Sequence, residues 1–86
     1  MESHEVISYP LMTESASLMV EKDNKLIFIV NLKAGKSDVK KAVEELYEIK
    51  VDKITTLITP QGQKKAFVKL KPEFKASDVA IKLGIL

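Results

Sequence analysis

Cysteine, tryptophan and arginine are absent from this chain of 86 residues. Without cysteine, the protein has no disulfide, no thiolate nucleophile and no cysteine-based zinc or iron–sulfur site. Without arginine, no guanidinium can read guanine edges bidentately, so any contact with nucleic acid depends on phosphates and shape. Histidine is also scarce, because His4 is the only one and stands near the N-terminus. No catalytic group of side chains can be assembled, and we expect neither an enzyme nor a metal site or cofactor.

Long apolar runs and a basic N-terminal start are missing as well. The longest apolar run, 26–30, is far too short to span a bilayer, and the first residues do not resemble a signal peptide. With 45% hydrophobic and 30% charged residues, the composition is that of a folded domain. We expect a single cytoplasmic domain over residues 1–86, with one modest aliphatic core and no membrane insertion.

Charge is distributed unevenly along the chain. Residues 1–21 contain four glutamates and no lysine, a balance of −4, which leaves +6 for residues 22–86 out of a total of +2. All 14 basic residues are lysines. The protein is therefore expected to combine an acidic N-terminal part with a basic body.

The clearest periodic pattern predicts a helix over residues 38–48. Apolar side chains recur there at i, i+3, i+4, i+7 and i+8, which places on one face Val39, Ala42, Val43, Leu46 and Tyr47. Strands are predicted where β-branched residues gather or where apolar residues occupy both alternating faces, as at 25–31. The other expected elements are strands at 6–9, 25–31, 51–59 and 64–70 and helices at 14–21 and 78–83.

Cap and turn residues separate these elements. Thr13, Ser37 and Ser77 are the expected N-caps of the three helices, and Gly84 is expected to close the last one. The segment 60–62, Pro-Gln-Gly, predicts a type I turn and hence a hairpin. The expected order is β-α-β-α-β-β-α, an α+β fold in which helices pack on a mostly antiparallel four-stranded sheet.

A first group of lysines surrounds the start of the helix at 38–48. Positive charge there opposes the helix dipole, and only Asp38 offsets it. A bound phosphate would reverse this disadvantage, because a helix N-terminus with lysines nearby attracts anions. A solvated helix face is the alternative, and the residues alone favour it because such electrostatic terms are small. The group consists of Lys33, Lys36, Lys40 and Lys41.

A second group of lysines lies on and after the strand at 64–70. Alternation along that strand places Lys65, Phe67 and Lys69 on one face, and Lys64 on the other face with apolar residues. Either an edge strand protected by lysine against aggregation or an RNA contact explains this pattern, and the residues do not decide between them. The group consists of Lys64, Lys65, Lys69, Lys71 and Lys75.

The segment 64–71, Lys-Lys-Ala-Phe-Val-Lys-Leu-Lys, followed after seven residues by Val79, resembles the signature of the ribosomal protein L23 family. Two further blocks are similar to that family in the same order, namely 9–16 to its start and 33–51 to its central helix. The loop 59–63 between the last two strands is short, which resembles archaeal members. Bacterial members have a long loop here that reaches into the tunnel wall.

This resemblance implies a structural constituent of the large ribosomal subunit, ribosome-bound in the cytoplasm, that binds large-subunit ribosomal RNA beside the exit of the nascent-chain tunnel. It also implies partners among neighbouring ribosomal proteins and tunnel-exit factors such as the signal recognition particle. Glu14 matches the acidic residue with which the family docks such factors. On the residues alone it is an ordinary carboxylate in the first turn of a helix, but the acidic balance of 1–21 favours a surface that avoids phosphates and stays available to protein. Ser15 and Thr55 depart from the family pattern, so no RNA contact is assigned to them. The expected ribosomal RNA contacts are Lys33, Lys36, Lys40, Lys64, Lys65 and Lys69.

Two other functions remain open on the residues alone. One is a small α+β regulatory or assembly domain that binds a protein or a metabolite and no RNA. The weaker one is a free reader of single-stranded RNA, because 66–68, Ala-Phe-Val, matches the RNA-recognition motif only in part and Leu70 stands where a stacking aromatic belongs. Salt-sensitive binding to ribosomal RNA would separate the main hypothesis from the first alternative.

Overall fold

The computed structural model describes residues 2–11 and 13–83 and confirms the α+β fold. Within these ranges the predicted order of elements is confirmed, and one further helix precedes it. None of the helices in these ranges is long and apolar enough to cross a membrane. The elements are α1 (Ser3–Val6), β1 (Ile7–Pro10), α2 (Glu14–Asp23), β2 (Lys25–Val30), α3 (Lys36–Tyr47), β3 (Val51–Ile58), β4 (Lys64–Leu70) and α4 (Ala76–Leu83).

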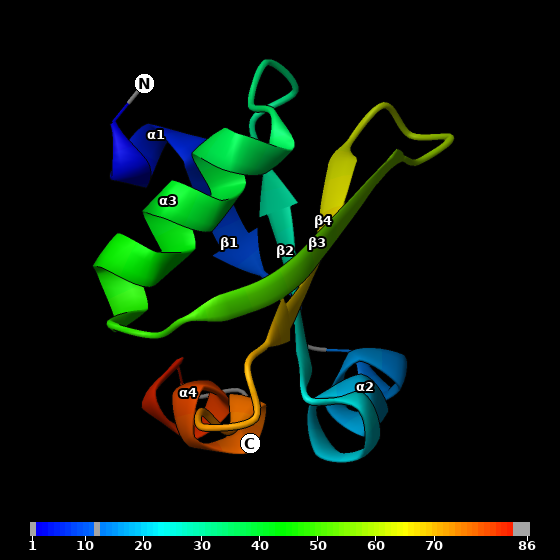
Figure 1. The fold of residues 1–86 in the computed structure, drawn as a ribbon. Coiled ribbons are helices and arrows are strands. Elements are labelled where there is room, and N and C mark those ends of the chain that lie inside the picture. The colour runs from blue at the N-terminus through cyan, green and yellow to red at the C-terminus, as the bar shows by residue number, and fades with distance from the viewer. Residues whose placement is uncertain (1, 12, 84–86) are drawn as a thin grey trace.

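The strands form one antiparallel sheet in the order β1-β2-β4-β3. Strands β2 and β4 are therefore inner strands, and β3 is an edge. Every residue of β2 from Leu26 to Val30 is buried, which confirms that this strand is covered on both faces. In Figure 1, α1 and α3 lie against one face of the sheet, whereas α2 and α4 lie at the end where β2 begins and β4 ends.

The main hydrophobic core lies between the sheet and the apolar face of α3. Val39, Ala42 and Val43 are at most 1% exposed, as their spacing predicts. Leu46, which the same spacing places on this face, is 44% exposed, so the prediction is wrong for the last turn of the helix at that position. They belong to one cluster with alternate residues of the strands, and the ring of Phe28 stacks on Tyr47 with centroids 5.7 Å apart. Each large side chain buried in this way stabilises the fold by about 1.5–3 kcal/mol.

One helix start is confirmed and one is wrong. The Thr13 hydroxyl accepts a hydrogen bond from the Ala16 amide at 3.1 Å, as expected of an N-cap. The prediction of Ser37 as a cap is wrong, because α3 begins directly after Gly35. The Asp38 carboxylate reaches back to accept a hydrogen bond from the Gly35 amide at 3.0 Å. With this hydrogen bond in place, α3 begins before Ser37, although Ser37 has the better capping propensity.

The last helix also begins earlier than predicted, whereas the hairpin turn forms where it was predicted. The prediction of Ser77 as a cap is wrong, because α4 already begins at Ala76. The closure expected at Gly84 lies outside the described residues. The hairpin turn is confirmed, since the Gly62 amide donates to the Thr59 carbonyl at 2.9 Å and Gly62 has a φ of 82°. The left-handed conformation suits glycine, which has no Cβ to clash with the backbone.

Asn24 connects two elements that are distant in sequence. Its backbone has a φ of 55° and ends α2 in the left-handed conformation. Its side-chain amide donates to the Phe74 carbonyl at 2.9 Å, and its side-chain oxygen accepts from the Ala76 amide at 2.6 Å. The end of α2 is thereby fixed to the start of α4.

Helix α1 is a single turn that the sequence did not predict. It is held mainly by tertiary contacts with α3. Val6 is 1% exposed and belongs to the main core, and the Ser3 hydroxyl donates to a Glu45 carboxylate oxygen at 2.9 Å. Such a short helix is not stable alone, so its formation depends on the rest of the fold.

Candidate nucleic-acid interface

Strand β4 presents different residues to the two faces of the sheet, as its alternation predicts. Ala66 and Val68 face the core and are 0% exposed, whereas Lys65, Phe67 and Lys69 face the opposite side. Because β4 pairs with a strand on each side, it is not an edge strand. Protection of an edge against aggregation therefore does not explain its lysines.

The register of the sheet places three lysines in one row. Lys69 of β4 pairs with Lys25 of β2 on one side and with Lys53 of β3 on the other. Directly paired residues have Cβ atoms about 5 Å apart, and like charges in such positions destabilise a sheet by roughly 0.2–1 kcal/mol per pair. In the described part of the chain, none of the three forms an ion pair. A row of phosphates would convert this repulsion into attraction.

Two further rows run beside this lysine row on the same face. From one strand to the next, the middle row reads Ile27–Phe67–Thr55 and the outer row reads Tyr9–Ile29–Lys65–Leu57. Phe67 stands in the middle row and is partly exposed, and Tyr9 stands at one end of the outer row, 45% exposed. The Gln63 side-chain amide donates to the Tyr9 hydroxyl at 2.8 Å, which links the hairpin to β1 across the sheet.

We call the surface formed by these three rows the lysine face. It contains four lysines and no carboxylate. Helix α2 packs mainly on β2 and α4, and α3 contacts β3 from the core side, so the part of the face on β3 and β4 stays accessible. Ile27 and Ile29 of β2 are buried, so the accessible part of the face is a basic surface around the partly exposed ring of Phe67. The residues of the whole lysine face are Tyr9, Lys25, Ile27, Ile29, Lys53, Thr55, Leu57, Lys65, Phe67 and Lys69.

Lys64 lies apart from its neighbour Lys65, on the core side of β4. Its Nζ donates to the Ala34 carbonyl at 2.6 Å, in a partly buried position. The contact attaches the loop before α3 to the sheet. Lys64 therefore already has an acceptor within the fold, whereas Lys65 stands on the lysine face.

The first lysine group meets the lysine face at the edge of the sheet. Lys36 and Lys40 line a shallow groove between α3 and β3 together with Lys53, which belongs to the lysine face. Asp52 also lines this groove, and Lys33 is exposed in the preceding loop. The two lysine groups found in the sequence are therefore joined through Lys53 around the edge strand.

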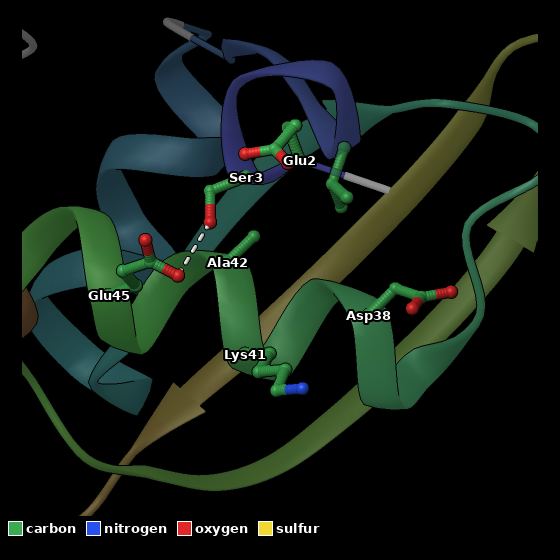
Figure 2. Close-up of a pocket in the computed structure, with 7 residues that line it drawn as sticks. Glu2, Ser3, Asp38, Lys41, Ala42 and Glu45 are labelled. Carbon is green, nitrogen blue, oxygen red and sulfur yellow. Dashed lines mark hydrogen bonds between the residues drawn. The ribbon is translucent and has the colours of Figure 1, made fainter.

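Carboxylates gather in a different groove, of about 230 Å³, between α1 and α3 (Figure 2). Glu2, Asp38 and Glu45 line it, and Lys41 is the only cation among its lining residues. The bond between Ser3 and Glu45 crosses it. No group of three or more histidine, aspartate or glutamate side chains in residues 2–11 and 13–83 could hold a metal ion. This groove is expected to repel phosphates.

The acidic residues of 1–21 do not form one surface. Glu14 is exposed in the first turn of α2, and Glu21 is exposed on the same helix. Glu2 and Glu5 lie at α1, which Figure 1 places at the opposite end of the sheet from α2. The acidic part predicted from composition is therefore divided between two separate sites.

Sequence reasoning missed Lys25, Lys53 and Tyr9 as members of the basic surface. A signal existed for Lys53, because counting back from the predicted turn at 60–62 pairs it with Lys69 across the hairpin. No local signal existed for Lys25 or Tyr9, because their positions depend on the pairing of strands distant in sequence.

The family model described as ribosomal protein L23 matches residues 5–83 of the chain. The matched region contains all four strands of the sheet and every residue of the lysine face.

Proposed function

The chain belongs to the ribosomal protein L23 family and is a protein of the large ribosomal subunit, and on this premise we propose that it binds large-subunit ribosomal RNA through the lysine face. The groove lined by Lys36, Lys40 and Lys53 extends that contact around β3. Lys33 contributes from the adjoining loop. The role of the protein is structural, as is that of its family.

The lysine row carries this proposal. Lys25, Lys53 and Lys69 repel one another in the free protein, and two of them stand on inner strands where no edge needs protection. Lysines that neutralise phosphates release condensed counterions, which is the main source of affinity in basic nucleic-acid interfaces. The absence of arginine is compatible with this mode, because phosphate contacts need charge and not a planar fork.

We further propose that the bound RNA lies beside the exit of the nascent-chain tunnel, with the protein ribosome-bound in the cytoplasm. The surfaces at α1 and α2 then remain for neighbouring ribosomal proteins and for exit factors such as the signal recognition particle. Glu14 is the residue we assign to factor docking, because it is exposed and stands on α2, which contributes none of the lysines of the lysine face. A negative charge there favours a basic partner.

Titration of a large-subunit ribosomal RNA fragment at several salt concentrations tests the RNA contact. We expect affinity to fall steeply with salt, and Lys65→Gln to lower the slope of log K against log salt by about 0.7–0.9, the contribution of one phosphate. Lys64→Gln is the matched control from the adjacent position. It should change the slope less and should lower the thermal midpoint, because it removes the bond to Ala34. An unchanged slope for Lys65→Gln would contradict the contact.

Glu14→Lys tests the docking role on assembled ribosomes. The substitution should cost the fold less than about 1 kcal/mol, because it affects only the helix dipole at an exposed position. Affinity for the signal recognition particle should fall, mainly through a slower association rate. Glu21→Lys, on the last turns of the same helix, is the control and should bind the particle normally. Equal affinity for native and Glu14→Lys ribosomes would remove Glu14 from the docking surface.

A further inference from the structure

Aromatic residues are few in this protein, and the structure divides them into two sets. The chain has three phenylalanines and two tyrosines. Phe28 and Tyr47 stack on each other in the core, and Phe74 packs against that core. The other two, Tyr9 and Phe67, both stand on the lysine face. Core formation therefore accounts for three rings and leaves two on the surface proposed to bind RNA.

Phe67 occupies the centre of that face. It lies on the inner strand β4 and is partly exposed, with Ile27 beside it on β2 and the short side chain of Thr55 beside it on β3. Lys65 and Lys69 stand two residues away on the same strand, each about 7 Å along it. An aromatic ring is thus placed between two cations in a single line.

The sequence argued against aromatic stacking because Leu70 occupies the position of a second aromatic. The structure changes that argument, since Leu70 is 1% exposed and belongs to the core on the other side of the sheet. The second ring on the lysine face comes instead from Tyr9, whose hydroxyl is fixed by Gln63 at 2.8 Å. The sheet therefore presents one ring from β4 and one from β1, and the ring from β1 could not be found in residues 64–71 alone.

We propose that Phe67 stacks on an unpaired base of the ribosomal RNA while Lys65 and Lys69 neutralise phosphates on either side of that nucleotide. The inference rests on the proposed RNA-binding function and specifies which kind of nucleotide the face takes. Paired bases in an A-form helix are stacked on their neighbours and offer no free face to a side chain, whereas a bulged or loop nucleotide does. The lysines supply attraction without sequence preference, and the ring supplies preference for an unpaired site.

The test uses the full chain and the fragment of large-subunit ribosomal RNA that it protects from nuclease. Each unpaired adenosine of that fragment is replaced in turn by 2-aminopurine, whose fluorescence falls when it stacks on an aromatic ring. Phe67→Leu removes the ring, and Phe67→Tyr restores one. Thermal unfolding of both variants verifies that the sheet is intact, which we expect because Phe67 lies outside the main core.

We expect native protein and Phe67→Tyr to quench one labelled position. Phe67→Leu should lose that quenching and bind roughly 5- to 150-fold more weakly, the usual range for loss of one base–aromatic contact. Its salt slope should equal that of the native protein, because no phosphate contact is removed. Equal affinity and equal quenching for Phe67→Leu would overturn the stacking inference and leave RNA binding by the lysines intact. Failure of the native protein to protect or bind any fragment would overturn both.

Discussion

Replacing Lys69 with glutamine should change folding stability and RNA affinity in opposite directions. Lys69 is the middle residue of the lysine row, so the substitution removes both cross-strand contacts between like charges at once. Each contact destabilises the sheet by roughly 0.2–1 kcal/mol, and the exposed position of Lys69 favours the lower half of that range. We expect the free protein to gain about 0.4–1 kcal/mol, equivalent to roughly 2–8 °C in the thermal midpoint of a domain of this size.

The same substitution should weaken RNA binding. If Lys69 neutralises one phosphate, its loss lowers the slope of log K against log salt by about 0.7–0.9. The gain in stability should shrink as salt is raised, because screening reduces repulsion between exposed charges. Thermal unfolding at low and high salt and RNA titration over the same salt range measure both effects on one sample.

Lys41→Gln is the matched control for this experiment. Lys41 lies on α3 and lines the groove with Glu2, Asp38 and Glu45, so the charged residues that share this groove with it are acidic. Its removal should slightly lower stability and leave the RNA salt slope unchanged. Lower stability for Lys69→Gln would refute the repulsion within the lysine row, and an equal change of RNA binding in both variants would refute the phosphate contact of Lys69.

Three further predictions concern the fold. Val43→Asp should cost several kcal/mol and lower the thermal midpoint severely, because it places a carboxylate at a position that is 0% exposed, and a retained midpoint would contradict the assigned core. Asn24→Ala should cost about 2–4 kcal/mol in denaturant unfolding, through lost hydrogen bonds and a φ of 55°, and Asn24→Gly should recover the backbone part only. Burial raises the pKa of the Tyr47 phenol above its usual value, so its contribution to stability is complete below about pH 10 and is lost as pH rises through the raised pKa. Tyr47→Phe should therefore be less sensitive to alkaline pH than the native protein, and identical profiles would refute this.

Local sequence patterns were sufficient for most of the elements but not for their ends. The apolar period of 38–48 and the alternation of 64–70 follow from helix and strand geometry, so each could be predicted from a short segment. The start of α3 could not be predicted in this way, because the hydrogen bond from the Gly35 amide to the Asp38 carboxylate places the N-cap at Gly35 and not at the expected Ser37. Helix α1 was missed for a related reason, since its stability comes from contacts with α3, some forty residues away.

The candidate site shows the same division between local and distant information. The face on which each β4 residue lies was predictable, and the hairpin turn determined that Lys53 pairs with Lys69. The pairing of Lys69 with Lys25 was not predictable, because β2 and β4 are separated by α3 and β3. The three-lysine row therefore exists only in the folded sheet, although each of its members was visible in the sequence.

The contrast between Lys64 and Lys65 explains why charge alone does not identify a binding residue. The two are adjacent and chemically identical, yet Lys64 donates to the Ala34 carbonyl in the free protein and contributes to stability whether or not RNA is present. Lys65 stands on a face without carboxylates, and Lys69 stands beside two other lysines. A lysine in such surroundings is expected to contribute most to RNA affinity, because a bound phosphate neutralises its charge and removes the repulsion from neighbouring lysines. Affinity is thus expected to concentrate in those lysines that contribute least to the stability of the free fold.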